Sequence, residues 1–140
     1  MFSTIENLLL QWQDDNTIPF VLVTGAKMKS AQSFCSGGDL KEITTYVANE
    51  KMLAVGMYFV LGEYWTLLDF VFNEYRLDRT IFRFAQKKAY IPLMDGYVMG
   101  GGAGVAFGGT FKIATERTVF SMPECGIGFF TDVCKPSINY

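Results

Sequence analysis

The sequence predicts an α/β fold in a single domain. Helical patterns alternate along the chain with short apolar runs rich in β-branched residues, which is typical of strands that lie between helices. Glycine clusters stand between these segments, where turns are expected. Half of the 140 residues are hydrophobic, so the chain is long and apolar enough to bury a core of its own.

The first elements follow from local periodicity. An amphipathic helix is predicted from Phe2 to about Asp15, because its apolar residues recur three or four positions apart. Residues 20–24, with the sequence Phe-Val-Leu-Val-Thr, are predicted to form a strand that is buried on both faces. A loop is expected over residues 26–34, and a second helix is expected to begin at Asp39, a good N-cap residue.

The remaining elements follow in the same way. A long helical region is predicted over residues 46–84, as two helices with a break between Tyr75 and Arg79. A shorter helix is predicted over residues 101–107, where Gly108 ends it. Three strands are predicted in this half of the chain, at residues 90–94, 111–115 and 119–122.

The composition excludes several classes of function. A net charge of −2 argues against nucleic acid as a partner, because phosphate backbones are bound by basic surfaces. The chain has no histidine, which excludes Ser-His-Asp and Cys-His catalysis within it. Its cysteines, Cys35, Cys125 and Cys134, lack the spacing of a zinc site. We therefore expect no metal, and free thiols indicate a reducing compartment.

No membrane association is expected either. The apolar stretch over residues 52–62 has only eleven residues before Glu63 follows it. A stretch of this length is too short to cross a bilayer. The first residues lack the basic start and apolar core of a secretory signal, and they lack the arginines of a transit peptide.

Two glycine clusters carry the strongest functional signal, residues 36–39 (Ser-Gly-Gly-Asp) and residues 100–104 (Gly-Gly-Gly-Ala-Gly). Glycine has no Cβ, so both clusters can bring backbone N–H groups close to a ligand. Two such donors aimed at one oxygen form an oxyanion hole. The second cluster does not match the nucleotide-binding pattern, since Phe107 stands where its last glycine would be. The alternative to a ligand site is a plain tight turn for residues 100–104. For residues 36–39 the alternative is a helix that Asp39 caps.

Three acidic residues are candidates for chemistry. Glu124 follows Pro123 directly at the end of a predicted strand, and Asp132 lies beyond an apolar segment that could return the chain towards Glu124. Two acids in a partly apolar environment acquire different pKa values, as an acid and a base require. Glu74 lies in the long helical region. Position alone favours solvent-exposed side chains for Glu74 and Glu124.

Together, three stretches resemble the crotonase (enoyl-CoA hydratase/isomerase) superfamily, and within it the 3-hydroxyisobutyryl-CoA hydrolases. They are residues 33–40 (Ser-Phe-Cys-Ser-Gly-Gly-Asp-Leu), residues 93–104 (Leu-Met-Asp-Gly-Tyr-Val-Met-Gly-Gly-Gly-Ala-Gly) and residues 111–133, which contain Ser-Met-Pro-Glu. The last two stretches are quite specific, and the likeness runs from about residue 2 to residue 133. The resemblance implies a crotonase-like (ClpP/crotonase) spiral of ββα turns that binds an acyl-CoA thioester.

The resemblance also implies a role for each candidate residue. The N–H groups of Ser36 and Gly101 would hold the carbonyl oxygen of the thioester as an oxyanion hole. Glu124 matches the family's catalytic carboxylate, either as a nucleophile or as a base for a water molecule. Asp132 matches the second acid of the hydrolases, and Glu74 matches a glutamate that contacts substrate, together with Gly101, Glu124 and Asp132. No cofactor is implied, since coenzyme A is part of the substrate.

Gly104 separates activities within the superfamily. By the resemblance, hydratases carry a second glutamate at this position, whereas the hydrolases carry glycine. The chain is therefore expected to be a 3-hydroxyisobutyryl-CoA hydrolase acting in valine breakdown, or an inactive fragment of one. The alternatives are an enoyl-CoA hydratase or isomerase and a non-catalytic truncated paralogue.

The resemblance covers part of the family's length, with the first strand pair and the C-terminal helices missing. Residues 1–133 would form a partial crotonase-like acyl-CoA domain, and residues 134–140 a divergent C-terminal tail. Open strand edges and apolar helix faces predict poor solubility or association into homo-oligomers. The family's usual compartment is the mitochondrial matrix, which we expect here by resemblance alone.

Overall fold

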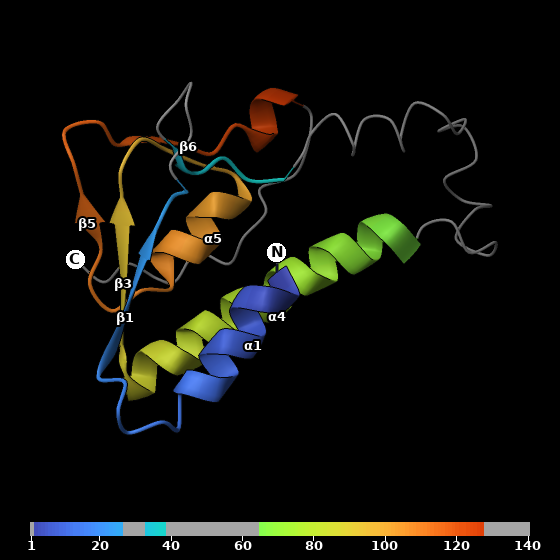
Figure 1. Cartoon of the computed structure of the whole chain (residues 1–140). Coiled ribbons are helices and arrows are strands. Elements are labelled where there is room, and N and C mark those ends of the chain that lie inside the picture. Colours follow the sequence, from blue (N-terminus) through green and yellow to red (C-terminus); the bar gives the residue numbers. More distant parts are fainter. Residues whose placement is uncertain (1, 27–32, 39–64, 128–140) are drawn as a thin grey trace.

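The computed structural model describes residues 2–26, 33–38 and 65–127, and Figure 1 shows how their elements are arranged. In chain order they are α1 (Phe2–Trp12), β1 (Phe20–Thr24), β2 (Ser33–Cys35), α4 (Trp65–Lys87), β3 (Ala89–Met94), β4 (Tyr97–Met99), α5 (Gly101–Phe107), β5 (Ile113–Ala114), β6 (Val119–Ser121) and the 3-10 helix η2 (Glu124–Ile127). The predictions of β1 and α5 are confirmed residue for residue. The expected helix start at Asp39 and residues 46–64 of the long helical region lie outside the described residues.

The strands form two parallel sheets. The first has the order β1-β3-β5 and the second the order β2-β4-β6. Successive strands therefore alternate between the two sheets, and the chain winds as a spiral in which each turn adds one strand to each sheet. This winding confirms the predicted α/β class and the ββα spiral.

The core lies where the helices meet the inner faces of the strands. α1 lies alongside α4, and both α4 and α5 contact β3 (Figure 1). α4 contributes Leu77, Ile81 and Phe84, whose spacing of four and three residues puts them on one face, at most 1% exposed. Each such side chain contributes roughly 1.5–3 kcal/mol by its burial. The other members of the core are Leu9, Val21, Phe34, Tyr90, Met94, Val98, Val105 and Ala106.

The expectation that β1 is buried on both faces is wrong. Val21 is buried, but its neighbours Phe20 and Leu22 are 54% and 53% exposed. In the part of the chain that the structure describes, helices contact the first sheet on one side, and the outward side chains of β1 have no cover. Ile113 of β5 is also exposed, so this outer face is apolar.

Two other expectations need correction. α4 runs without a break from Trp65 to Lys87, because its buried stripe continues through the segment from Tyr75 to Arg79, which contains neither glycine nor proline. The strands β2 and β4 were not predicted, since each has three residues and is defined by pairing with distant segments. The strand expected over residues 111–115 is limited to Ile113–Ala114.

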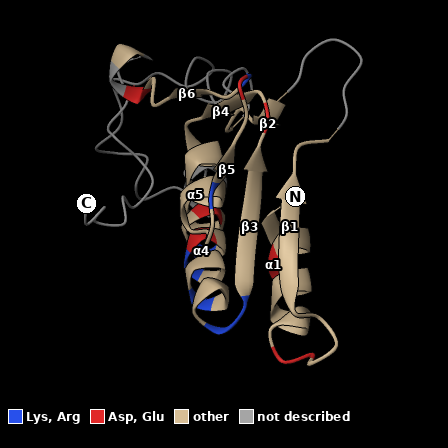
Figure 2. Ribbon diagram, turned by 90° about the vertical axis from the view of Figure 1, so that its left-hand side faces the viewer, with Lys and Arg blue, Asp and Glu red and all other residues tan. Residues whose placement is uncertain are grey.

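Figure 2 shows where the charged residues of the described part lie. They are on the helices and in the turns, whereas β1 and β3 carry none. Among the described helices, none combines the length and the apolar character that a membrane span requires.

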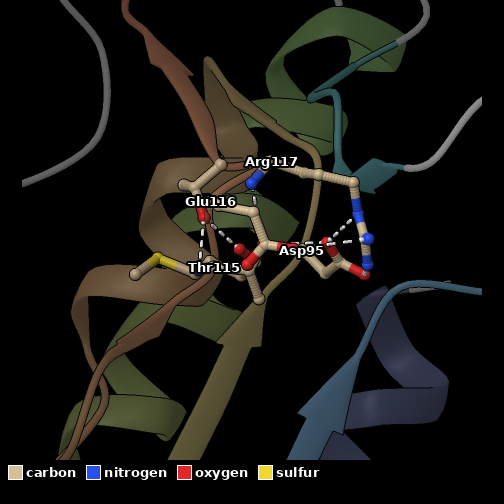
Figure 3. Close-up of polar contacts among 6 residues, drawn as sticks. Asp95, Thr115, Glu116 and Arg117 are labelled. Carbon is tan, nitrogen blue, oxygen red and sulfur yellow. Dashed lines mark hydrogen bonds and ion pairs between the residues drawn. The ribbon is translucent and has the colours of Figure 1, made fainter.

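One polar cluster joins the turns that lead into β4 and β6. Asp95, at the turn after β3, accepts hydrogen bonds from Thr115 Oγ1 at 2.9 Å, Arg117 Nε at 2.9 Å and Arg117 Nη2 at 2.6 Å (Figure 3). Thr118 Oγ1 donates to the carbonyl of Met94. These contacts hold the starting points of the adjacent strands β4 and β6 together.

An ion pair joins α1 to α4 and gives the fold a pH-dependent contribution. Arg76 Nε lies 3.0 Å from both carboxylate oxygens of Glu6, and this hydrogen bonding holds the pKa of Glu6 below its usual 4.5. A carboxyl whose folded-state pKa is lowered stabilises the fold above its unfolded value, and this contribution disappears as the pH falls through the lowered value. We expect Arg76→Gln to lower the thermal unfolding midpoint at neutral pH but not in strong acid.

Circular dichroism melts at the two pH values measure this difference. Lys87→Gln is the matched control, because Lys87 pairs at 3.2 Å with Asp14, whose side chain is 73% exposed, and such pairs contribute little. An equal loss for Arg76→Gln at both pH values would mean that the stabilisation comes from packing of the arginine stem.

Candidate active site

Three of the sequence motifs follow neighbouring strands of the second sheet. Ser36 follows β2, Gly100 follows β4, and Glu124 lies three residues after the end of β6. Because the strands are parallel and adjacent in the order β2-β4-β6, their carboxyl ends lie at the same edge. Ligands of α/β proteins bind at such an edge. We call it the strand-end edge.

The two glycine clusters lie in contact at this edge. Gly37 has a positive φ of 85°, and a Cβ built on it would lie 2.9 Å from the carbonyl oxygen of Met99 and 3.2 Å from the backbone nitrogen of Gly101. Gly100 has a φ of 51°, which also favours glycine. Just before Gly37, the hydroxyl groups of Ser36 and Ser33 are hydrogen-bonded at 2.8 Å. The first cluster is thus fixed directly against the start of α5.

Glu124 lies beside the second cluster. The N–H of Gly100 donates to the carbonyl of Ser121 at 3.2 Å, and a Cβ built on Gly100 would lie 3.0 Å from Oε1 of Glu124. The residue is only 6% exposed, so the expectation of a solvated side chain is wrong. Its Oε2 is buried and, in the part of the chain that the structure describes, has no hydrogen-bond partner. Such a group costs stability, which is typical of a position kept for a ligand or a reaction.

Glu74 approaches the same glycines from α4. It is 5% exposed, so its expected position on the helix surface is wrong as well. A Cβ built on Gly101 would overlap Oε1 of Glu74. Glu74 and Glu124 therefore reach adjacent residues of the second cluster from different elements.

Cys35 lies at the end of β2, directly before the first cluster. A Cβ built on Gly102 would overlap the carbonyl oxygen of Cys35, so β2 and α5 pack backbone to backbone here. Burial raises the pKa of the Cys35 thiol, and the charge of Glu74 raises it further, against the effect of a hydrogen bond from Gly37. A thiol with a raised pKa is a poor nucleophile at neutral pH.

Sequence reasoning missed Asp78, which follows Glu74 by one turn of α4, and Tyr90 of β3. A Cβ built on Gly104 would lie 2.5 Å from both carboxylate oxygens of Asp78. The phenol of Tyr90 is wholly buried, and burial raises its pKa, with the charge of Asp78 as a second cause. The spacing of four residues between Glu74 and Asp78 on one helix is the signal that could have identified Asp78.

Other parts of the predicted site lie outside the described residues. They are Asp132 and Asp39, and the predicted tail of residues 134–140 lies outside the described residues as well. The roles of Ser36, Gly101, Glu74 and Glu124 stay predictions, although the structure brings these residues to one edge. Within residues 2–26, 33–38 and 65–127, no three cysteine, aspartate or glutamate side chains are grouped as a metal site would need.

Comparison with known proteins gives one consistent family. The family model described as enoyl-CoA hydratase/isomerase matches residues 1–137. The chain is 38% identical over 135 residues to the mitochondrial 3-hydroxyisobutyryl-CoA hydrolase of Danio rerio, covering 95% of this chain and 30% of that protein. It is 35% identical over 133 residues to 3-hydroxyisobutyryl-CoA hydrolase 1 of Arabidopsis thaliana, with the same coverage.

Among solved structures, the fold is similar to that of a carnitinyl-CoA dehydratase from Mycobacterium thermoresistibile. The TM-score is 0.73 and the identity 36%, covering 94% of this chain and 33% of that one. The chain thus spans about 30% of the length of the curated relatives it matches.

Proposed function

The chain belongs to the enoyl-CoA hydratase/isomerase family, and on this premise we propose that it carries the catalytic centre of an acyl-CoA thioester hydrolase acting on 3-hydroxyisobutyryl-CoA. The observation that carries the proposal is the strand-end edge. There, the first glycine cluster, the Gly100–Gly101 turn and the buried carboxylate of Glu124 lie together. Backbone donors beside an unpartnered carboxylate are what acyl transfer requires.

The proposed binding mode starts from the thioester carbonyl. Its oxygen accepts hydrogen bonds from the backbone N–H groups of Ser36 and Gly101, which belong to the two clusters in contact. These donors stabilise the negative charge that develops on the oxygen as the carbonyl carbon is attacked. Glu74, which lies against Gly101, contacts the substrate beside this oxygen.

Glu124 supplies the attack in one of two ways. As a nucleophile, its carboxylate adds to the carbonyl carbon, the C–S bond breaks, and coenzyme A leaves as a thiolate while an acyl-enzyme anhydride forms. Water then hydrolyses the anhydride to the free acid. As a base, Glu124 takes a proton from a water molecule, whose hydroxide adds to the carbonyl carbon directly; the C–S bond then breaks, and the proton passes from Glu124 to the leaving thiolate. Asp132 orients the substrate hydroxyl or assists the proton transfer.

The remaining assignments follow the same family resemblance. Coenzyme A enters as part of the substrate, and no separate cofactor or metal is invoked. We place the reaction in valine breakdown in the mitochondrial matrix, and the names of several relatives describe those proteins as mitochondrial. The exposed apolar face of the first sheet supports association of the chain into a homo-oligomer.

Release of free thiol from 3-hydroxyisobutyryl-CoA by the purified chain tests this function. We expect release above the buffer rate, with water addition to crotonyl-CoA at background level. Hydration of crotonyl-CoA instead would support the hydratase alternative. Turnover of neither substrate would favour a non-catalytic paralogue.

A further inference from the structure

The helices α4 and α5 are joined by a repeated contact that the proposed mechanism does not use. One stripe of α4 consists of Glu74, Asp78 and Ile81. Their side chains face, in the same order, three glycines in or directly after α5, namely Gly101, Gly104 and Gly108. A Cβ built on Gly104 would lie 2.5 Å from Asp78 Oδ1 and Oδ2 and 2.7 Å from Cγ, and one on Gly108 would lie 2.8 Å from Ile81 Cγ2. Each α4 side chain therefore occupies the space that an α5 side chain would need.

The middle contact of the stripe is the unusual one. Both carboxylate oxygens of Asp78 are inaccessible to solvent, and Gly104 is fully buried. An apolar side chain such as Ile81 would fill a buried notch at lower cost than a carboxylate does. The close approach of both oxygens and Cγ to one point means that the flat carboxyl group is fitted against the backbone of α5.

The direction of helical side chains connects this contact to the strand-end edge. Side chains on a helix lean towards its N-terminus. Both helices run in the same direction, since Glu74 faces Gly101 and Ile81 faces Gly108. Asp78 therefore leans towards the turn in which Glu74 and Glu124 flank Gly100 and Gly101. A side chain at position 104 would lean the same way, and Asp78 excludes it.

We infer that Asp78 is a positioning residue of the site, which seats α5 on α4 by the shape of its carboxyl group at Gly104. This inference rests on the proposed function. Asp78 touches neither substrate nor reacting atoms; it fixes the depth at which the Gly100–Gly101 turn meets Glu74 and Glu124. The volume of the Asp78 carboxyl group, rather than its charge, sets this position of α5.

A double-mutant cycle on thermal stability tests the packing without any need for activity. Gly104→Ala should lower the unfolding midpoint by about 5 °C or more in the native background. In the Asp78→Ala background the clashing atoms are gone, and the same substitution should cost much less. Arg79→Ala, at the exposed neighbour of Asp78 on α4, is the matched control and should show no such coupling. An equal cost of Gly104→Ala in all backgrounds would overturn the inference.

Steady-state hydrolysis of 3-hydroxyisobutyryl-CoA separates shape from charge. Asp78→Asn keeps the shape and removes the charge, so kcat should stay within about threefold of the native value. Asp78→Glu keeps the charge but adds a methylene, so kcat should fall by about tenfold or more, with a smaller change in KM. A lower kcat for Asp78→Asn than for Asp78→Glu would overturn the role of shape. If the native chain does not release thiol at all, the proposed function fails. The double-mutant cycle on thermal stability then still tests whether Asp78 packs against Gly104 as inferred.

Discussion

Glu124→Gln is expected to reduce kcat for hydrolysis of 3-hydroxyisobutyryl-CoA by on the order of 1000-fold, because the amide can act neither as a nucleophile nor as a base. The stability of the fold should not fall. Glu124 is 6% exposed and its Oε2 has no partner among the described residues, so a neutral isostere removes the cost of a buried carboxylate. A large loss of activity without loss of stability distinguishes a catalytic residue from a structural one.

Glu116→Gln is the matched control, since that side chain is 82% exposed. It should leave both kcat and the unfolding midpoint unchanged. Kinetics of thiol release and thermal melts of the three proteins complete the comparison. Full activity of Glu124→Gln would remove Glu124 from the mechanism, whatever its position beside Gly100.

Rapid quenching followed by mass spectrometry separates the two roles of Glu124. If the carboxylate is the nucleophile, the peptide that contains residue 124 should carry the acyl group during turnover. If it is a base, no acyl group should become attached. Oε2 of Glu124, which has no hydrogen-bond partner among the described residues, is compatible with either role, because both need one carboxylate oxygen free to meet the carbonyl carbon or a water molecule.

The fold could be predicted from sequence wherever a local pattern decides the structure. The apolar run of β1 and the helix of α5 between glycines were predicted with their observed bounds, since each is set by its own residues. The short strands β2 and β4 could not be predicted in this way. Their backbone bonds are made with segments far away in the chain, and three residues hold no period of their own.

The candidate site shows the same division. The glycine clusters marked places where the backbone can approach a ligand closely, and the structure adds that Gly37 and Gly100 have positive φ. The burial of Glu74 and Glu124 could not be read from their neighbours in sequence, because both side chains are covered by other elements. Asp78 was missed for a related reason, since its partner Gly104 lies on another helix. Residue type thus indicates which chemistry is possible. Whether the candidate residues come together at one place depends on the order of the strands in the second sheet.

The contact between the glycine clusters leads to the second large prediction. Gly37→Ala should destabilise the fold by about 2–4 kcal/mol and lower kcat by on the order of 100-fold or more. The alanine must adopt a φ near 85°, which costs roughly 1–2 kcal/mol for a residue with a Cβ. That Cβ would also press on the carbonyl oxygen of Met99 and the nitrogen of Gly101, which are backbone atoms without rotamers to change. The two clusters must separate, and one oxyanion donor is lost.

Gly126→Ala is the matched control for this substitution. Gly126 also lies in the described region, and a Cβ built on it would have no atom of the described residues within 4 Å. Urea unfolding and thiol-release kinetics should show it close to the native chain. The informative result is the pattern of kinetic change in Gly37→Ala. Separated donors still admit the substrate but stabilise its developing charge less, so kcat should fall more than KM rises. A normal kcat in a destabilised Gly37→Ala protein would mean that the carbonyl oxygen is held elsewhere than between these two clusters.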